Sequence, residues 1–334
     1  MTNRAAVLHA PGDVRVEERP MPSPGAREVV VEVTAVGVCG SDVHYYEHGR
    51  IGDHVVRAPM ILGHESAGNV VEVGSEVSRH AVGDRVTLEP GVPCGRCVQC
   101  RAGRYNLCPD VVFFATPPVD GAFANFVAIH EDFAFALPDG MSDEVGALME
   151  PLSVAIWACR KAGVSAGDRV LVTGAGPIGL LCQQAARAFG ATSVEISDVS
   201  EPRLELARRT GATRTLRAGR DAPAEADALI ECSGHPDALM AGIAAVRPAG
   251  TAVVVGMGPG ETAELPLALI QNREIWLTGT FRYAGTYPTA IALAAQGRVD
   301  LDAIVTGRFP LEQTERALRA GRDDPGSVKA VVRP

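Results

Sequence analysis

The segment Arg169-Val-Leu-Val-Thr-Gly-Ala-Gly-Pro-Ile-Gly179 decides the fold of this 334-residue chain. An apolar strand leads into Gly174, Gly176 and Gly179, and an amphipathic helix is predicted directly afterwards, over 177–189. In this arrangement the first glycine permits a tight turn, the second lets the backbone approach a pyrophosphate, and the third lets the helix pack on the strand. The helix N-terminus offers free N–H groups to the anion. The segment therefore predicts a dinucleotide-binding unit.

An acidic residue favours NAD over NADP as the dinucleotide. Asp198 ends the next predicted strand, 19 residues after Gly179, where a carboxylate would accept the ribose hydroxyls and repel a 2′-phosphate. Arg203 could instead hold that phosphate or stack on adenine. The residues that we expect to contact the cofactor are Gly174, Gly176, Pro177, Ile178, Gly179, Asp198, Arg203, Val255, Gly256, Met257 and Phe281.

Strand and helix patterns alternate on either side of this segment. This alternation predicts a doubly wound, parallel α/β sheet with helices on both faces. The strands are predicted at 169–173, 193–197, 228–231 and 251–255, and the helices at 147–162, 177–189 and 202–210. The chain before it is β-rich, with Val-rich runs at 29–33 and 67–73, and a helix at 286–296 and a strand at 328–332 follow it. We therefore expect a β-rich domain that is interrupted by the nucleotide-binding domain and completed by the C-terminal segment.

The composition excludes several classes of partner. A net charge of −9 without a basic stretch argues against a nucleic-acid-binding protein. No apolar run reaches the roughly 20 residues of a membrane span, and the N-terminus does not resemble a signal peptide. We therefore expect a cytoplasmic protein without a membrane partner. In that reducing compartment, clustered cysteines indicate metal binding rather than disulfides.

Four of the eight cysteines fall within 15 residues, in the pattern Cys94-x-x-Cys97-x-x-Cys100 followed by Cys108. Four thiolates satisfy the tetrahedral coordination of zinc and leave no position for a substrate, so we expect a structural zinc site in a lobe at 90–110. Nucleic-acid zinc fingers use similar chemistry, but the flanks here are not basic.

A second set of metal-ligating residues is dispersed along the chain. It comprises Cys39, the pair His64-Glu65, and Glu150, which together would give an open zinc site with room for water or an alcohol. Each residue also has a simpler interpretation, since a single cysteine is often a small buried apolar residue, and Glu150 could be an acid at a helix start. The spacing of these four residues alone does not show that they form one metal site.

At these residues the sequence resembles the zinc-dependent medium-chain alcohol dehydrogenases. The pattern Gly63-His64-Glu65-x-x-Gly68-x5-Gly74-x-x-Val77 matches the zinc segment of that family at every fixed position. Within the family the chain most resembles the sorbitol and xylitol (polyol) dehydrogenases, through segments 39–45, 49–53, 113–118, 150–154 and 281–283. The resemblance implies a GroES-like catalytic domain at 1–147 plus 283–334, and a Rossmann domain at 148–282.

The resemblance also implies roles for individual residues. Cys39, His64 and Glu65 would hold the catalytic zinc, with Glu150 ligating it directly or through water. The positions that would line the polyol site are Tyr45, Ile51, Phe114, Glu150, Arg282 and Tyr283. We expect Glu150, or a water beside it, to accept the alcohol proton, with Ser41 and His44 relaying it to solvent.

The resulting hypothesis is an NAD-dependent zinc enzyme that oxidises a sugar alcohol to the ketose. The family also implies a homotetramer or a dimer, formed through a sheet edge near 274–281. Two alternatives stay open: a zinc dehydrogenase of another secondary alcohol, such as a vicinal diol or L-threonine, and an NAD-binding zinc protein without catalysis. The second alternative predicts damage at the four candidate ligands of the open zinc site, and all four are intact.

Overall fold

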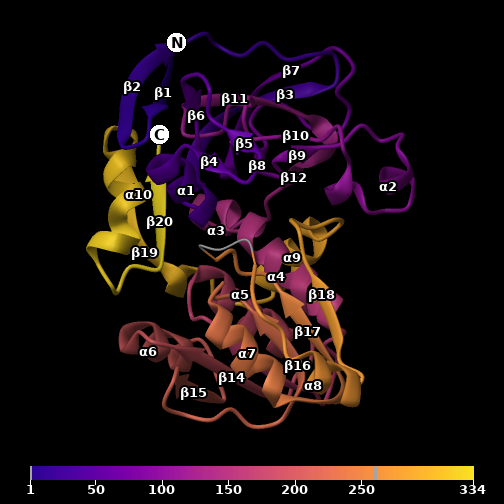
Figure 1. Ribbon diagram of the computed structural model, residues 1–334. Coiled ribbons are helices and arrows are strands. Elements are labelled where there is room, and N and C mark those ends of the chain that lie inside the picture. The colour runs from indigo at the N-terminus through magenta and orange to yellow at the C-terminus, as the bar shows by residue number, and fades with distance from the viewer. Residues whose placement is uncertain (1, 259–261) are drawn as a thin grey trace. The chain divides into compact units, whose positions relative to one another are not determined.

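The computed structural model describes residues 2–258 and 262–334, which divide into two compact units (Figure 1). Unit 1 comprises Met1–Glu150 and Val305–Pro334, and unit 2 comprises Pro151–Ile304. The first division falls inside helix α4 (Met149–Ala162). Among the described residues, none of the helices combines the length and apolar character needed to cross a bilayer.

Unit 2 is built on a six-stranded parallel sheet, which confirms the predicted fold class. The strands follow the order β15-β14-β13-β16-β17-β18, the order of a Rossmann fold. Their bounds are β13 (Arg169–Thr173), β14 (Ser193–Asp198), β15 (Arg214–Arg217), β16 (Ala226–Glu231), β17 (Val246–Val254) and β18 (Trp276–Gly279). The helices are α5 (Pro177–Ala188), α6 (Glu201–Arg209), α7 (Pro236–Ala245), α8 (Leu267–Asn272) and α9 (Tyr287–Ala295).

The central strand of this sheet explains its parallel arrangement. In β13 the residues Val170, Leu171 and Val172 are all buried, as expected when helices cover both faces of a sheet. Leu171, Leu229 and Ile243 belong to one apolar cluster, in which α7 packs on the strands. This buried strand ends at Thr173, and the glycine-rich turn begins directly after it, at Gly174.

Unit 1 is dominated by a seven-stranded sheet of mostly antiparallel strands. It has the order β12-β8-β7-β3-β20-β19, with β11 paired to β3. These strands are β3 (Glu28–Gly37), β7 (Glu65–Val73), β8 (Arg85–Leu88), β11 (Phe126–His130), β12 (Ala134–Ala136), β19 (Val305–Pro310) and β20 (Lys329–Arg333). The C-terminal strand β20 pairs with β3, so the end of the chain completes the sheet that its beginning starts (Figure 1).

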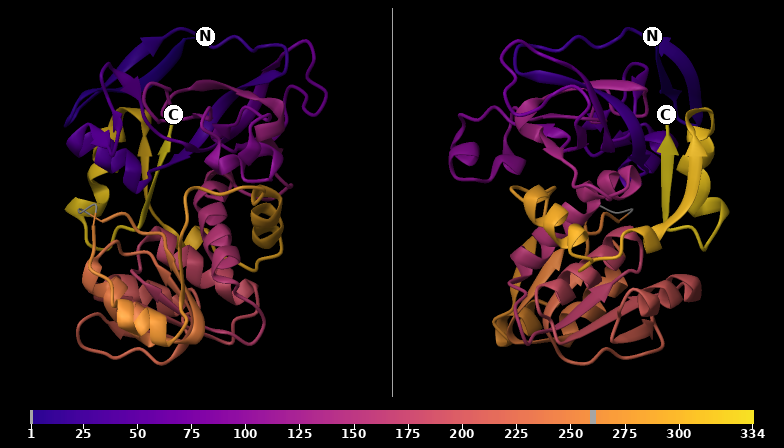
Figure 2. Two further views of the ribbon diagram at one scale, coloured as in Figure 1. Left: turned by 45° about the vertical axis from the view of Figure 1, so that its right-hand side comes forward. Right: turned by 180° about the vertical axis from the view of Figure 1, so that it is seen from behind.

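Shorter elements surround this sheet. A three-stranded sheet holds β1 (Asn3–Ala10), β2 (Asp13–Arg19) and β6 (Met60–Ile61), and two ribbons hold β4 (Arg50–Ile51) with β5 (His54–Val55) and β9 (Gly91–Val92) with β10 (Val112–Phe113). The helices are α1 (Gly40–His48), α2 (Val98–Arg101), α3 (Asp143–Ala147) and α10 (Thr314–Asp323). The segment that carries α2 extends from the sheet as a separate lobe, as Figure 1 and the right view of Figure 2 show.

The C-terminal boundary lies at 304/305 instead of the predicted 282/283. Residues 283–304 therefore belong to unit 2, because hydrogen bonds hold them there. Arg160 of α4 donates to the carbonyl of Gly285 at 3.2 Å and to Thr289 Oγ1 at 3.0 Å. Gln184 of α5 donates to the carbonyl of Asp300 at 3.2 Å. These contacts join distant parts of the chain, so the irregular pattern after Gly279 did not reveal them.

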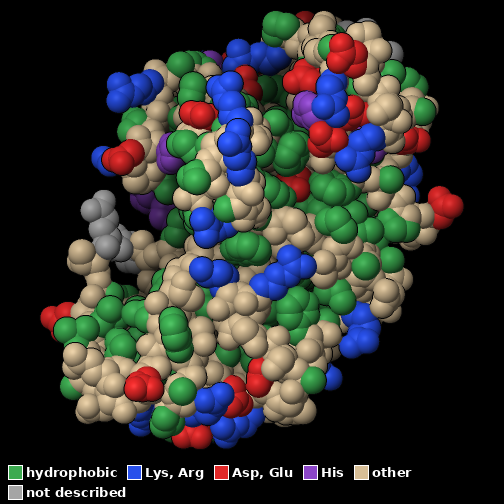
Figure 3. All heavy atoms as spheres, turned by 90° about the vertical axis from the view of Figure 1, so that its right-hand side faces the viewer, with side chains coloured by type: hydrophobic (Ala, Val, Ile, Leu, Met, Phe, Trp, Pro, Cys, Tyr) green, Lys and Arg blue, Asp and Glu red, His purple; other side chains and the backbone are tan. Residues whose placement is uncertain are grey.

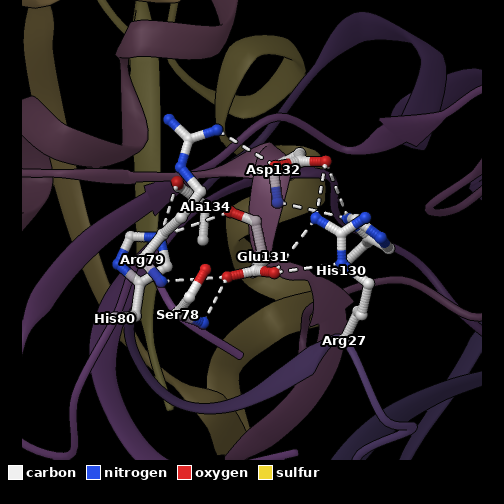
Figure 4. Close-up of polar contacts among 8 residues, drawn as sticks. All are labelled: Arg27, Ser78, Arg79, His80, His130, Glu131, Asp132 and Ala134. Carbon is white, nitrogen blue, oxygen red and sulfur yellow. Dashed lines mark hydrogen bonds and ion pairs between the residues drawn. The ribbon is translucent and has the colours of Figure 1, made fainter. Parts of the chain in front are cut away.

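A buried carboxylate fixes one end of the large sheet of unit 1 (Figure 4). Glu131 accepts hydrogen bonds from the backbone N–H groups of Ser78 and Arg79 at 2.9 and 3.0 Å, and from Arg27 Nε at 3.1 Å. These donors favour the ionised form, and they lower the pKa of Glu131 to about 2 against the desolvation that burial imposes. Glu131 thus ties the loop at 78–80 to β3 and β11.

Glu131 should make unit 1 sensitive to acid. Because its pKa is about 2 in the folded protein and about 4.5 in the unfolded chain, its contribution is fully present above pH 4.5 and is lost as the pH falls towards 2. Glu131→Gln should therefore lower the Tm by several degrees at pH 7 and reduce the loss of Tm between pH 4.5 and 2. Thermal melts over this range check the expectation. An equal acid dependence in wild type and variant would contradict it.

Candidate active site

Three of the predicted zinc ligands meet in unit 1. The Cys39 sulfur, a His64 ring nitrogen and a Glu65 carboxylate oxygen all lie within 4.8 Å of one another. Cys39 directly precedes α1, whereas His64 and Glu65 are buried at the start of β7. Sulfur, imidazole nitrogen and carboxylate oxygen are donors that zinc accepts, and three protein ligands leave a fourth position open for substrate. This donor set fits the metal that the sequence predicts.

Asp42 connects two of these ligand segments and escaped the sequence reasoning. Its buried carboxylate accepts hydrogen bonds from the backbone N–H of Cys39 at 3.0 Å and of Gly63 at 2.9 Å, and it lies 3.7 Å from His64 Nδ1. Burial alone would lower the pKa of His64, but the nearby Cys39 and Asp42 raise it well above its usual value. Cys39 is the N-cap residue of α1, and Asp42 lies three residues after it, where an acidic side chain completes a capping box. This pattern could have identified Asp42 from the sequence.

Lys329 of β20 is the second residue that sequence reasoning missed. It is buried, and its ammonium lies 2.8 Å from both carboxylate oxygens of Glu65. Burial alone would lower the pKa of Lys329, but the charges of Glu65 and Cys39 raise it overall. The sequence does carry a signal, because Lys329 is a charged residue directly before the apolar run Ala330-Val331-Val332.

Two further carboxyl groups lie buried in the same unit. Glu150 stands at the start of α4 and is not part of the three-ligand cluster. Glu89 follows β8 and accepts a hydrogen bond from the Tyr105 hydroxyl at 2.7 Å. Burial raises the pKa of Glu89 to about 7, with a further contribution from the charge of Glu150. Nothing in the sequence distinguished Glu89, because its role depends on burial.

The predicted substrate and relay residues are divided between the two units. Unit 1 carries the half-buried Ser41 and His44 and the buried Tyr45 on α1, Ile51 in β4, and Phe114 after β10. In unit 2, the Arg282 guanidinium lies 4.8 Å above the ring of Phe281. The buried Tyr283 ring has its centroid 5.9 Å from that of Tyr287. Arg282 adopts a left-handed backbone with a φ of 51°, a conformation that non-glycine residues tend to keep at functional sites.

The four clustered cysteines also come together. The sulfur atoms of Cys94, Cys97, Cys100 and Cys108 all lie within 4.8 Å of one another in the lobe that carries α2. Backbone N–H groups of Arg96 and Cys97 lower the pKa of Cys94 to about 7, which favours the thiolate that a metal requires. Four convergent sulfurs fit a closed zinc site, as the spacing predicts.

Replacing Cys97 with serine should destabilise the lobe. Loss of a structural metal removes binding energy that also supports folding, and we expect a cost of about 4 kcal/mol or more. At about 2–4 °C per kcal/mol, the Tm should fall by roughly 10 °C. Thermal melts combined with zinc analysis by mass spectrometry check this, and one zinc per chain should be lost. Val98→Ala, at the neighbouring exposed position of α2, should change neither quantity.

Four of the eleven predicted cofactor residues line a cavity of about 700 Å³ in unit 2. Its lining includes Gly174, Gly176, Asp198 and Arg203, together with Cys232, Ser233 and His235 from the loop after β16. A Cβ atom at Gly176 would meet no atom within 4 Å, so this position leaves free space at the start of α5. At Gly179 a Cβ would lie 1.8 Å from the carbonyl oxygen of Gly174, so only glycine fits there. The turn and the cavity fit a dinucleotide.

Asp198 has a structural contribution beyond the predicted one. One carboxylate oxygen accepts the backbone N–H of Ala175 at 2.7 Å, and the other accepts that of Ser200 at 2.7 Å. The carboxylate therefore holds the glycine-rich turn, and its remaining lone pairs can still accept ribose hydroxyls.

Glu231 holds the loop after β16, part of which lines the cavity, and was also missed. The buried carboxylate accepts hydrogen bonds from the backbone N–H groups of Ser233 at 2.7 Å and Gly234 at 3.0 Å. Its carbonyl accepts those of Val255 and Gly256, two of the predicted cofactor residues. An acid that ends an apolar strand was the available signal. The other predicted residues, Pro177 and Ile178, begin α5, and Met257 is exposed.

Comparison with known proteins agrees with this arrangement. Residues 25–139 match the model of the alcohol dehydrogenase GroES-like domain, and residues 177–296 match that of the zinc-binding dehydrogenases. Sorbitol dehydrogenase of Bos taurus is 45% identical over 99% of this chain and 96% of its own length. Sorbitol dehydrogenase of Bacillus subtilis is 44% identical over 99% of this chain and 97% of its own length.

A solved structure shows the same similarity in three dimensions. L-idonate 5-dehydrogenase from Escherichia coli superposes with a TM-score of 0.94 at 32% identity, over 100% of this chain and 99% of the other. Full-length matches in sequence and structure show the family, not only the fold. The chain therefore belongs to the zinc-dependent medium-chain alcohol dehydrogenases, in the group of the sorbitol dehydrogenases.

Proposed function

We propose that this protein is a zinc-dependent polyol dehydrogenase that transfers hydride from a sugar alcohol to NAD and releases the ketose. The observation that carries the proposal is the open set of Cys39, His64 and Glu65, whose ligand atoms lie within 4.8 Å of one another. A closed set would suit a structural metal, but three ligands leave a position for substrate. The similarity to sorbitol dehydrogenases supports a polyol as that substrate.

The chemistry is divided between two bound groups and the side chains that hold them. When bound, zinc supplies a Lewis acid for the alcohol oxygen and NAD accepts the hydride. Cys39, His64 and Glu65 would hold the metal. Asp198 would orient the adenosine ribose, and the turn that begins at Gly174 would bind the pyrophosphate.

The alcohol proton needs an acceptor, and Glu150 is the proposed one. Its carboxylate is buried at the start of α4, and its charge acts on both Glu89 and Lys329. From there Ser41 and His44, one helical turn apart on α1, would carry the proton towards solvent. The His44 ring lies 5.6 Å from the ring of the exposed His48, which extends this route to the surface.

Tyr45, Arg282 and Tyr283 would bind the additional hydroxyl groups of the polyol, and Ile51 and Phe114 would form the apolar wall. A site built to hydrogen-bond several hydroxyls rejects an alcohol that lacks them, because its buried polar groups would be left without partners. The enzyme should therefore discriminate strongly against 2-propanol.

A panel of substrates tests this function. Purified protein with NAD should reduce the cofactor with xylitol, sorbitol or another pentitol or hexitol at a kcat/KM at least about 1,000-fold above that with 2-propanol. Activity confined to 2,3-butanediol or L-threonine would keep the zinc chemistry but contradict the polyol assignment. If protein that holds two zinc ions per chain showed no activity with any alcohol, the assignment of this protein as an alcohol-oxidising enzyme would be contradicted.

We further propose a homodimer or tetramer assembled through the edge strand β18. This strand ends the sheet of unit 2, and its Trp276 is 74% exposed. Figure 3, which faces the side that carries β18 in Figure 1, shows hydrophobic side chains at the surface of unit 2. An unpaired strand edge is a template for pairing with a second copy. Sedimentation velocity should show no monomer at micromolar concentration, and a Trp276→Glu variant should dissociate.

The chemistry of the cysteines is consistent with a reducing compartment. All eight are free thiols: five belong to the two proposed zinc sets, and the other three lie buried or half-buried in unit 2. We propose the cytoplasm as the place of action.

A further inference from the structure

The two lysines of this protein stand in opposite environments. The chain has 31 lysines and arginines together, and only Lys161 and Lys329 are lysines. Lys161 is exposed near the end of α4, whereas the Lys329 side chain is only 2% exposed. A buried ammonium is costly unless it is fully paired. The use of lysine at this buried position therefore needs a local reason.

The three hydrogen-bond donors of the Lys329 ammonium all have acceptors close by. Its Nζ lies 2.8 Å from each carboxylate oxygen of Glu65 and 2.9 Å from the carbonyl oxygen of Val38. Val38 directly precedes Cys39, so Lys329 contacts both segments that carry these ligands. A compact ammonium with three donors suits this arrangement, whereas a planar guanidinium would need more room.

Strand β3 separates Glu65 from Lys329, and a glycine lets them meet. In the order β7-β3-β20, Gly37 of β3 pairs with Glu65 on one side and with Val331 on the other. A Cβ atom at Gly37 would lie 2.0 Å from Glu65 Oε2. The Glu65 side chain therefore crosses β3 over this glycine to reach Lys329.

We propose that Lys329 is a positioning residue of the metal centre, which holds the Glu65 carboxylate and the Cys39 segment in the geometry that zinc requires. The inference rests on the proposed zinc site at Cys39, His64 and Glu65. A carboxylate has enough lone pairs to accept hydrogen bonds from the ammonium and still bind a metal. The ammonium also offsets one of the negative charges that the ligands bring into the interior. Without Lys329, Glu65 would be a buried carboxylate free to turn away.

Zinc retention in two matched variants tests this role. Lys329→Met keeps the length of the side chain and removes its charge, and Lys161→Met removes the exposed lysine as a control. Zinc transfer from the purified proteins to a chromophoric chelator is followed over time. Partners that hold metal ligands typically change metal affinity 10- to 100-fold, so one zinc should leave K329M about 10–100 times faster than it leaves wild type or K161M.

The four-cysteine site in the same molecule is the internal reference. Its zinc should leave all three proteins at one rate, because a general loss of stability would accelerate both sites. Equal release of the first zinc from K329M and wild type, or equal acceleration at both sites, would overturn the positioning role. If wild type held zinc only at the four-cysteine site, the proposed function would fail as well. The zinc content of the wild type thus separates the two failures.

A second comparison remains informative if K329M does not fold. Glu65→Gln removes the carboxylate charge, and the double variant E65Q/K329M contains neither buried charge. If Lys329 acts through Glu65, the double variant should release zinc at the same rate as E65Q. A further 10-fold acceleration in the double variant would show that Lys329 acts independently of Glu65 and would overturn the proposal. Lys329→Arg should retain zinc better than K329M, because it keeps the positive charge.

Discussion

Replacing His64 with alanine should lower kcat/KM for polyol oxidation by about 1,000-fold or more. The imidazole is one of only three proposed protein ligands, and its loss leaves two, Cys39 and Glu65, to hold the catalytic metal. A Lewis acid that stabilises developing charge by about 4 kcal/mol accounts for a factor of this size. Initial rates of NADH formation with the best polyol of the panel measure the effect.

The same variant should keep its fold and its cofactor site. His64 lies in unit 1, and the cavity that Asp198 and Gly176 line lies in unit 2, so the Kd for NADH should change by less than about twofold. Fluorescence titration with NADH provides this control, and zinc analysis should show one ion per chain instead of two. Wild-type activity in the variant would contradict the zinc mechanism, whereas loss of NADH binding would show that the variant had misfolded.

Replacing Asp198 with asparagine should shift cofactor preference towards NADP. The carboxylate at this position would repel a 2′-phosphate, and removing its charge should raise the ratio of kcat/KM for NADP to that for NAD by about 10- to 100-fold, or roughly 1.4–2.7 kcal/mol. Asparagine retains an oxygen that can accept one of the two backbone N–H groups, from Ala175 or Ser200. It disturbs the turn less than alanine would. Steady-state rates with both cofactors measure the ratio.

Asp237 provides the control for this experiment, because it lines the same cavity and is exposed. Asp237→Asn removes an equal charge and should leave the cofactor ratio within about twofold. An unchanged ratio in Asp198→Asn would refute the assignment of Asp198. A similar shift in both variants would indicate that the overall charge of the cavity, and not the ribose contact, sets the preference.

Much of the fold could be predicted because its signals are local. The glycine turn at 174–179 follows an apolar strand and opens a helix within a dozen residues, so periodicity and turn chemistry sufficed. The parallel sheet and the family were confirmed by the structure and the comparisons. The compact units divide at 304/305 and not at the predicted boundary of 282/283, because residues 283–304 are held by Arg160 and Gln184, which lie more than 100 residues away in sequence.

The candidate site, like the fold, was predicted mainly where its signals are local. The spacing of the four clustered cysteines predicted the closed zinc set, whereas the open set was joined only by the resemblance to the family. The assignments of individual residues stay predictions. Asp42 and Glu231 left local signals, but their burial and their contacts with Gly63 and with Val255 and Gly256 do not show in the sequence. Lys329 was missed because its partner is distant in the chain. Lys329 and Glu65 are separated by 264 residues, and only the register of β7, β3 and β20 brings them together. A sequence pattern read over short windows does not contain that register.

The central claim is that a removable zinc ion makes this protein oxidise polyols with NAD. The direct measurement is NADH formation at 340 nm from xylitol and sorbitol, before chelation, after chelation and after zinc is added back. We predict that the activity disappears when the more easily removed zinc is taken away, and that it returns when one equivalent of zinc per chain is added back. Full activity in protein from which that zinc has been removed, verified by mass spectrometry, would contradict the account.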